Sequence, residues 1–137
     1  MIRDVNSERW CNVTSMEMRL PIVAVVDDDP AVCGSLKFSL ELEGFAVRAY
    51  ASGAELLDAG DLADCSCLVV DQRMPGMSGM ELIARLRERK VLTPAVLIVS
   101  HLNAALRARA AKELVPIVEK PLLGNGLLDR IREACQR

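Results

Sequence analysis

Short apolar runs, separated by segments with helical periodicity, constrain the fold of this chain more than any other feature. Ile22–Val26 is an uninterrupted apolar run, as expected for a strand buried on both faces of a sheet. Short apolar-rich segments predict four more strands, over residues 45–50, 67–70, 95–99 and 115–118. Strands that alternate with helices favour a parallel sheet, because each return to the sheet is then a helical crossover.

Helices are predicted in the five intervals after these strands. Pro30 follows Asp29, a good N-cap residue, and Gly44 ends the first helix. Ser52 and Glu55 fit a capping box that opens a short second helix. The remaining helices are predicted over residues 80–89, 104–114 and 122–135. The pattern therefore predicts an α/β fold, a doubly wound (βα)₅ unit with a five-stranded parallel sheet.

Length and charge limit the function classes. The 137 residues suit one domain, with residues 1–20 as an N-terminal extension without periodicity and residues 21–137 as the folded unit. A net charge of −2 argues against nucleic-acid binding by bulk electrostatics. No apolar run is long enough to span a bilayer and the first residues do not resemble a secretory signal, so we expect a cytoplasmic protein without membrane contact.

The five cysteines are scattered and odd in number, which predicts thiols rather than a disulfide framework. Cys65 and Cys67 are close enough in sequence to suggest a zinc site. Such a site needs a second pair of ligands, and His101 is the only histidine, so we favour ordinary thiols.

Polar residues follow four of the five predicted strands. Carboxyl ends of parallel strands meet at one edge of a sheet, where the crevice of such folds lies. Clustered carboxylates repel unless a cation intervenes, and hard oxygen ligands suit Mg²⁺. A carboxylate nucleophile beside a lysine and a hydroxyl has the groups that phosphoryl transfer requires. The residues expected at this edge are Asp27, Asp28, Asp29, Asp71, Ser100 and Lys120.

Each of these residues alone has a simpler explanation. Asp29 is better explained as a helix N-cap than as a metal ligand, and Ser100 could cap the following helix. Lys120, which precedes a proline, could be an ordinary surface lysine. The inference depends on the whole set, in which successive core strands each end in a residue suited to the same chemistry.

Four segments together resemble the receiver domains of two-component response regulators. They are Val-Val-Asp27-Asp28-Asp29-Pro, Asp71-Gln-Arg-Met-Pro-Gly-Met-Ser-Gly79, Leu-Ile-Val-Ser100 and Val-Glu-Lys120-Pro121. The resemblance runs from about residue 21 to residue 136 and looks closest to receivers of nitrogen-fixation and LuxR-type regulators. It implies a flavodoxin-like fold with strand order 2-1-3-4-5.

The resemblance implies a role for each matching residue of the acidic cluster. Asp71 matches the aspartate that accepts the phosphoryl group. Asp27 and Asp28 match the acidic pair that organises Mg²⁺, with Asp28 the more direct ligand. Asp71 and the backbone carbonyl of Arg73 would complete the protein's share of the metal shell.

The same resemblance implies partners and a switch. Ser100 matches the switch hydroxyl and Lys120 the lysine that contacts the phosphoryl group, and the Lys120–Pro121 bond is often cis in the family. The donor would be a sensor histidine kinase or a phosphotransfer protein, and an output partner would read the result. Homodimers are possible. The domain would catalyse only its own phosphorylation and dephosphorylation, so we do not expect an enzyme in the usual sense.

Two departures and two alternatives accompany this interpretation. Ile117 stands where the family usually has an aromatic residue, and His101 stands where it usually has a small one; we expect His101 to face solvent. A pseudo-receiver that acts without phosphorylation is one alternative. A small haloacid-dehalogenase-type phosphatase is the other, since Asp27 and Asp29 have the spacing of that nucleophile motif.

Overall fold

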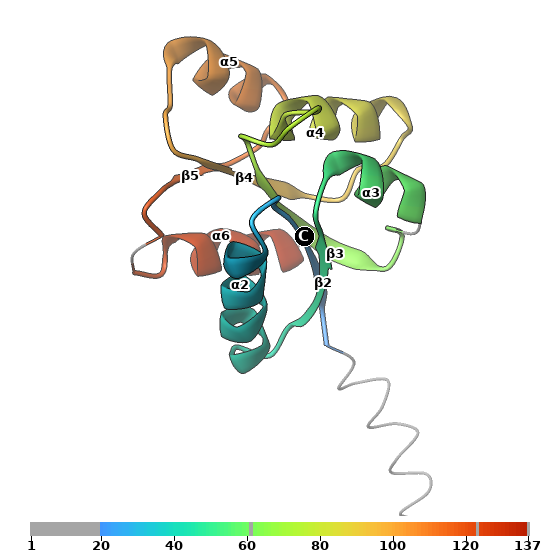
Figure 1. The fold of residues 1–137 in the computed structure, drawn as a ribbon, viewed down its shortest axis with the longest axis vertical. Helices are drawn as coiled ribbons and strands as arrows, with labels where there is room; N and C mark the ends of the chain where they lie inside the picture. Colours follow the sequence, from blue (N-terminus) through green and yellow to red (C-terminus); the bar gives the residue numbers. More distant parts are fainter. Residues whose placement is uncertain (1–19, 61, 123, 137) are drawn as a thin grey trace, which may run out of the picture.

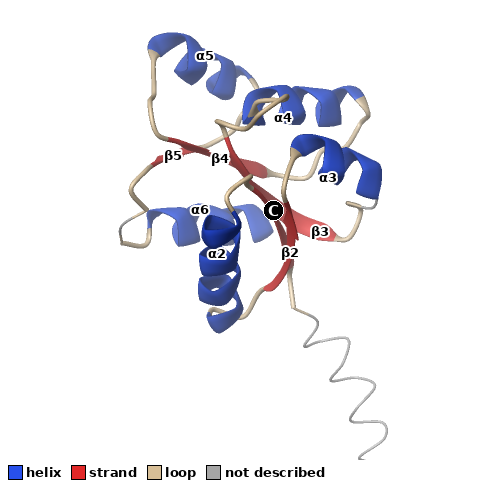
Figure 2. Ribbon diagram, in the orientation of Figure 1, coloured by secondary structure: helices blue, strands red, loops and turns tan. Residues whose placement is uncertain are grey.

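A five-stranded parallel sheet runs through the centre of the protein, with helices on both of its faces (Figures 1 and 2). The computed structural model describes residues 20–60, 62–122 and 124–136. The predicted strand order, β2-β1-β3-β4-β5, is confirmed. The strands are β1 (Ile22–Val26), β2 (Ala46–Tyr50), β3 (Cys65–Asp71), β4 (Ala95–Val99) and β5 (Ile117–Glu119).

Helices α2 and α6 cover one face of the sheet, and α3, α4 and α5 cover the other (Figure 2). Each helix follows a strand, and all except the last helix, α6, return the chain to the amino end of the next strand. The helices are α2 (Pro30–Leu42), α3 (Gly53–Ala59), α4 (Gly79–Glu88), α5 (Ala104–Lys112) and α6 (Gly126–Cys135).

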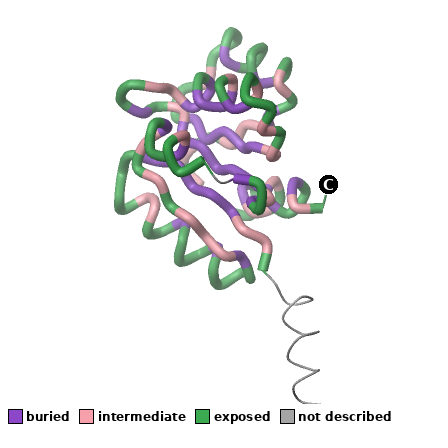
Figure 3. Tube along the Cα trace, turned by 90° about the vertical axis from the view of Figure 1, so that its right-hand side faces the viewer, coloured by how far each residue is buried: buried purple, intermediate pink, exposed green. Residues whose placement is uncertain are grey.

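The central strands β1, β3 and β4 form the most deeply buried part of the protein (Figure 3). In β1, Val23 and Val25 pack toward α2 and α6, whereas Ala24 and Val26 pack toward α3 and α4. Successive residues of a strand point to opposite faces, so a strand covered on both sides needs apolar residues at every position. This is why the strands read as continuous apolar runs.

Several predicted boundaries are wrong by a few residues. Strand β3 begins two residues earlier than predicted. Strand β5 begins at Ile117 rather than at residue 115, because the Val115 N–H donates to the Ala110 carbonyl at 2.8 Å and Pro116 has no N–H. Helix α6 begins four residues late, at Gly126, because Gly124 adopts a φ of 69° in the preceding turn.

The proposed N-terminal extension over residues 1–20 lies outside the described residues, apart from Leu20, and so does Cys11. The thiols of Cys33 and Cys135 are free, as predicted. Within the described residues, no helix is both long and apolar enough to cross a membrane.

We expect Gly79→Ala to lower the free energy of unfolding by about 1–3 kcal/mol. A Cβ at this position would lie 2.6 Å from the Asp71 carbonyl oxygen and 2.7 Å from the Leu97 Cδ1. The carbonyl belongs to β3 and can move only if the strand end moves with it. Urea unfolding measures the loss.

Gly34→Ala is the matched control for this substitution. Gly34 lies exposed within α2, and a Cβ there would meet no atom within 4 Å. The change should therefore raise the free energy of unfolding by about 0.5–1 kcal/mol through helix propensity. Equal stability of the Gly79→Ala and wild-type proteins would contradict the close approach seen at β3.

Candidate functional site

The carboxyl edge of the sheet holds an open pocket that contains every predicted site residue. The strand register explains this, since Val26 pairs with Val70 and Val99 pairs with Glu119. The residues that follow these positions are therefore brought level with one another. The polar residues that line the pocket are Asp27, Asp28, Asp29, Asp71, Arg73, Ser100 and Lys120.

Three of the carboxylates form a close cluster. Asp27, Asp28 and Asp71 each place a carboxylate oxygen within 4.8 Å of the others. Asp27 and Asp71 are 3% and 4% exposed, whereas Asp28 is exposed. Burial raises the pKa of Asp27, and the nearby charge of Asp71 raises it further. The cluster is thus held together at an electrostatic cost to the folded protein.

Asp27 also shows that the cluster is suited to a cation. Its Oδ1 accepts a hydrogen bond from the Asp29 N–H at 2.9 Å, but its Oδ2 is buried and has no hydrogen-bond partner. Buried carboxylate oxygens nearly always have a donor or a metal. An unsatisfied oxygen beside two further carboxylates is the donor set that a hard divalent ion such as Mg²⁺ prefers.

Lys120 supplies the positive charge at this site. Its Nζ lies 2.9 Å from the Asp71 Oδ1, and this hydrogen bond raises the pKa of Lys120, so the amine is charged. The second oxygen of Asp71 accepts from the Arg73 N–H at 3.2 Å. The Lys120 N–H donates to the Val99 carbonyl at 2.8 Å, which fixes the backbone of the lysine, and the Lys120–Pro121 bond is cis, as expected.

The remaining predicted residues occupy the pocket rim. Ser100 follows β4 and is exposed, so its hydroxyl is available to a ligand. His101 is exposed as well, in agreement with the prediction that it faces solvent. Asp29 is the N-cap of α2 and accepts from the Ala31 N–H at 2.9 Å, as predicted, and it is not part of the close carboxylate cluster.

Sequence reasoning missed Gln72, the residue directly after Asp71. Its N–H donates to the Ile98 carbonyl at 2.9 Å, and its own carbonyl accepts from the Gly79 N–H at 3.1 Å. Its side-chain Oε1 accepts from the Met80 N–H at 2.9 Å. Gln72 therefore joins the end of β3 to β4 and to the first turn of α4. A glutamine in a loop carries no sequence signal for such contacts.

Replacing Gln72 with leucine should lower the free energy of unfolding by about 1–2 kcal/mol, because the buried Met80 N–H then lacks an acceptor. Hydrogen exchange of the Met80 amide should accelerate together with the loss of stability. Gln72→Glu keeps an acceptor oxygen and should retain most of the protection. Unchanged exchange at Met80 in the leucine variant would show that the side-chain bond does not hold the helix start.

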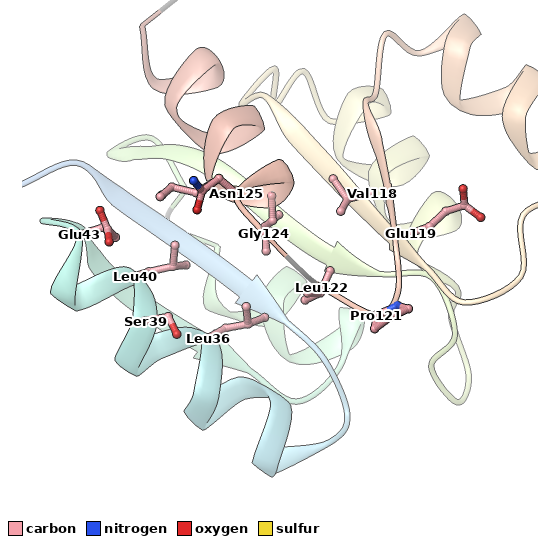
Figure 4. Close-up of a pocket in the computed structure, with 12 residues that line it drawn as sticks. Leu36, Ser39, Leu40, Glu43, Val118, Glu119, Pro121, Leu122, Gly124 and Asn125 are labelled. Atoms are coloured by element: carbon pink, nitrogen blue, oxygen red, sulfur yellow. The ribbon is translucent and has the colours of Figure 1, made fainter.

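A second hollow lies between α2, the end of β5 and the loop that precedes α6 (Figure 4). It is lined largely by apolar residues such as Leu36 and Leu40, and one of its polar residues, Glu43, pairs with Arg132 at 2.8 Å. Among the described residues, the group of acidic side chains close enough to hold a metal ion together is Asp27, Asp28 and Asp71, and it lies in the acidic pocket rather than in this hollow.

The family model described as the response regulator receiver domain matches residues 23–132. The chain is a member of the response-regulator receiver family. Receiver domains are signalling modules of two-component systems. These domains interact with histidine kinases and output domains, and they generally bind Mg²⁺. The resemblance predicted from the four motifs is thus confirmed.

Individual relatives support the same assignment of this receiver. It is 38% identical over 116 residues to the transcriptional regulatory protein FixJ of Azorhizobium caulinodans, covering 84% of this chain and 55% of FixJ. It is 37% identical over 110 residues to the C4-dicarboxylate transport transcriptional regulatory protein DctR of Rhodobacter capsulatus, covering 78% and 56% of the two chains. The receiver thus spans about half the length of these curated relatives.

The solved structure of FixJ-N superposes on this receiver with a TM-score of 0.77 and 34% identity, covering 85% of this chain and 94% of that one. The chemotaxis protein CheY4 of Vibrio cholerae, at 21% identity and a TM-score of 0.76, shares the fold. The flavodoxin-like fold class predicted for the receiver is confirmed.

Proposed function

We propose that Asp71 is the residue of this receiver that accepts a phosphoryl group. The observation that carries the proposal is the setting of its carboxylate. It lies buried at the end of β3, 2.9 Å from the Lys120 amine and beside two further carboxylates. A nucleophile held between an ammonium and a cation-binding cluster is oriented and charge-balanced before its substrate arrives.

The residues that would hold Mg²⁺ are Asp27, Asp28 and Asp71, with the backbone carbonyl of Arg73. The unsatisfied Oδ2 of Asp27 supports this assignment. When bound, the ion would neutralise the clustered carboxylates and polarise a phosphoryl oxygen. Its positive charge would also offset the charge of Asp71, which adds to the effect of burial in raising the pKa of Asp27.

Asp71, Lys120 and Ser100 then have separate roles in phosphoryl transfer. A carboxylate oxygen of Asp71 attacks the phosphorus of a phosphohistidine, the P–N bond breaks, and the imidazole nitrogen leaves with the electron pair. The Lys120 ammonium turns from Asp71 to the phosphoryl oxygens, and the Ser100 hydroxyl donates to another of them. Attack of water on the acyl phosphate later returns Asp71 to its carboxylate and releases inorganic phosphate.

The donor in this proposal is a sensor histidine kinase or a phosphotransfer protein, and the receiver itself catalyses only its own phosphorylation and dephosphorylation. The functional unit comprises residues 21–137, with residues 1–20 as an extension. It acts in the cytoplasm on an output partner, without direct contact with nucleic acid or membrane. Dimerisation of the receiver with a second copy of itself is one way in which it can transmit the signal. Ile117 in place of an aromatic residue implies that the switch uses a different side-chain rearrangement.

Acetyl phosphate with Mg²⁺, followed by mass spectrometry of proteolytic fragments, tests the proposal. We expect one phosphoryl adduct, on Asp71, and none without the metal. An adduct on Asp27 would instead support the haloacid-dehalogenase-type reaction. No adduct from acetyl phosphate, and no amide shifts when beryllofluoride and Mg²⁺ are added, would support the pseudo-receiver.

A further inference from the structure

The charges of the chain are distributed unevenly along its sequence. Residues 79–114, which contain α4, β4 and α5, hold seven basic and three acidic side chains. The rest of the chain holds ten basic and sixteen acidic side chains. One segment thus carries a clear excess of positive charge although the whole chain has a net charge of −2. Because β4 is wholly apolar, this excess lies on α4, α5 and the turns beside them.

Helices α4 and α5 lie next to each other on the same face of the sheet, on the side away from α2 and α6 (Figures 1 and 2). A shallow groove runs between them. Its floor includes the half-buried Ala84, and every other lining residue is exposed and charged. The lining residues are Glu81, Ala84, Arg85, Glu88 and Arg89 from α4 and its end, and Arg109 from α5.

The three arginines of this groove retain unused donors. Among the described residues, none of Arg85, Arg89 and Arg109 lies within 4.0 Å of a carboxylate oxygen. Glu81 does not neutralise them by contact, since its Oε1 accepts from the Ser78 N–H at 2.8 Å as part of the α4 capping box. Three guanidinium groups therefore face solvent without a paired anion.

We propose that the α4–α5 groove is a docking surface for an acidic segment of a partner protein, whose carboxylates pair with Arg85, Arg89 and Arg109. A guanidinium presents a planar fork of N–H donors that matches a carboxylate in bidentate geometry. An interface of this kind gains specificity and association rate from complementary charge. The proposal does not depend on the phosphorylation of Asp71, because no residue of the groove lines the acidic pocket.

The groove suits a polypeptide better than the alternatives. Glu81 and Glu88 lie in the same groove and would repel a continuous phosphate backbone, but they can accept hydrogen bonds from the donors of a protein segment. A second copy of this chain, offering one of its acidic surfaces, would make a head-to-tail contact. Such contacts form open chains unless the rotation closes a ring, which disfavours this occupant.

Amide shifts of the ¹⁵N-labelled 137-residue chain, unphosphorylated and in EDTA, test the proposal. The probe is a synthetic peptide with glutamates at i and i+4 spacing, compared with the same peptide carrying glutamines. We expect the glutamate peptide alone to shift the amides of α4 and α5 that line the groove. The variant R85E/R109E should weaken binding about tenfold or more, since two attractive contacts become repulsive.

The variant R107E/K112E is the matched control, because Arg107 and Lys112 are exposed on the same helix α5 but lie outside the groove. It changes the net charge by the same amount as R85E/R109E and should weaken binding less than about twofold. Far-ultraviolet circular dichroism checks that each variant is folded. If R85E/R109E loses helix, Arg89→Gln, which removes one guanidinium without reversing its charge, carries the test and should weaken binding measurably.

Three results would overturn the inference. Equal losses of binding in R107E/K112E and R85E/R109E would show general attraction to a basic face rather than binding in the groove. If a duplex DNA shifted the same amides and bound more tightly than the glutamate peptide, the surface would be assigned to nucleic acid. Concentration-dependent self-association in sedimentation, lost only in R85E/R109E, would assign it to a second copy of the chain.

Discussion

Lys120→Met should slow the phosphorylation of Asp71 by acetyl phosphate about 100- to 1,000-fold, the range measured when one charge-stabilising donor is removed from an active site. The Lys120 Nζ is the one ammonium that lies against the Asp71 carboxylate among the described residues, at 2.9 Å. Methionine fills similar space but leaves developing negative charge on the phosphoryl oxygens unbalanced. Mass spectrometry at timed intervals measures the rate.

The same substitution should lower the free energy of unfolding by about 1–3 kcal/mol. Breaking a fully buried ion pair costs more, but the Lys120 side chain is 32% exposed, so solvent already screens part of the interaction. Asp71 would be left buried among like charges. Urea unfolding in EDTA measures this loss without interference from metal binding.

A double-mutant cycle separates the ion pair from other effects of Lys120. In an Asp71→Asn background the lysine has lost its partner, so Lys120→Met should then cost much less stability. Lys37→Met is the control for loss of a surface lysine, because Lys37 is exposed on α2 and its ion pair with Glu41 is long, at 4.0 Å. A wild-type phosphorylation rate in Lys120→Met would remove the lysine from the proposed mechanism.

Asp27→Asn should raise the free energy of unfolding of the metal-free protein by about 1–3 kcal/mol at neutral pH, the scale of one unsatisfied buried polar group. The variant keeps an oxygen to accept from the Asp29 N–H, and its new NH₂ group can donate to the neighbouring carboxylates. One of three clustered negative charges disappears. Millimolar Mg²⁺ should stabilise the wild-type protein, and much less the variant, because a ligand has been lost.

The dependence on pH has a defined sign. Burial raises the pKa of Asp27 above 3.8, so in the metal-free protein the folded state binds this proton more tightly than the unfolded state does. The contribution of Asp27 to the free energy of unfolding therefore falls as the pH rises from 3.8 through the folded-state pKa. Above that pKa the carboxylate is ionised in both states, and its destabilising effect is complete. The gain from Asp27→Asn should be complete at neutral pH and should shrink as the pH is lowered toward 3.8. A gain that is constant with pH would show that the carboxylate charge is not its cause.

Local patterns predicted most of the core and the residues of the acidic pocket. Apolar-rich segments predicted all five strands, and the signal was strongest for β1 and β4, because a strand buried on both faces needs an apolar residue at every position. The pocket residues could be identified because each lies at the end of a core strand or within a few residues beyond it, and parallel strands end at one edge. Turn positions were predicted less well. The start of α6 and the start of β5 were misplaced because the backbone at Gly124 and the bonding of Val115 depend on neighbouring segments.

By itself, the sequence determined the layered α/β architecture, the strand order through its family motifs, and the set of side chains that meet at the carboxyl edge. These features follow from periodicity and from residue types, which are local properties of the chain. Only the tertiary structure decided which atoms face one another. It brought the Lys120 amine to Asp71, left one oxygen of Asp27 without a donor, tied Gln72 to α4, and placed the arginines of two separate helices along one groove. Those contacts depend on the register of neighbouring strands and on the packing of helices from distant parts of the chain, which no single segment encodes.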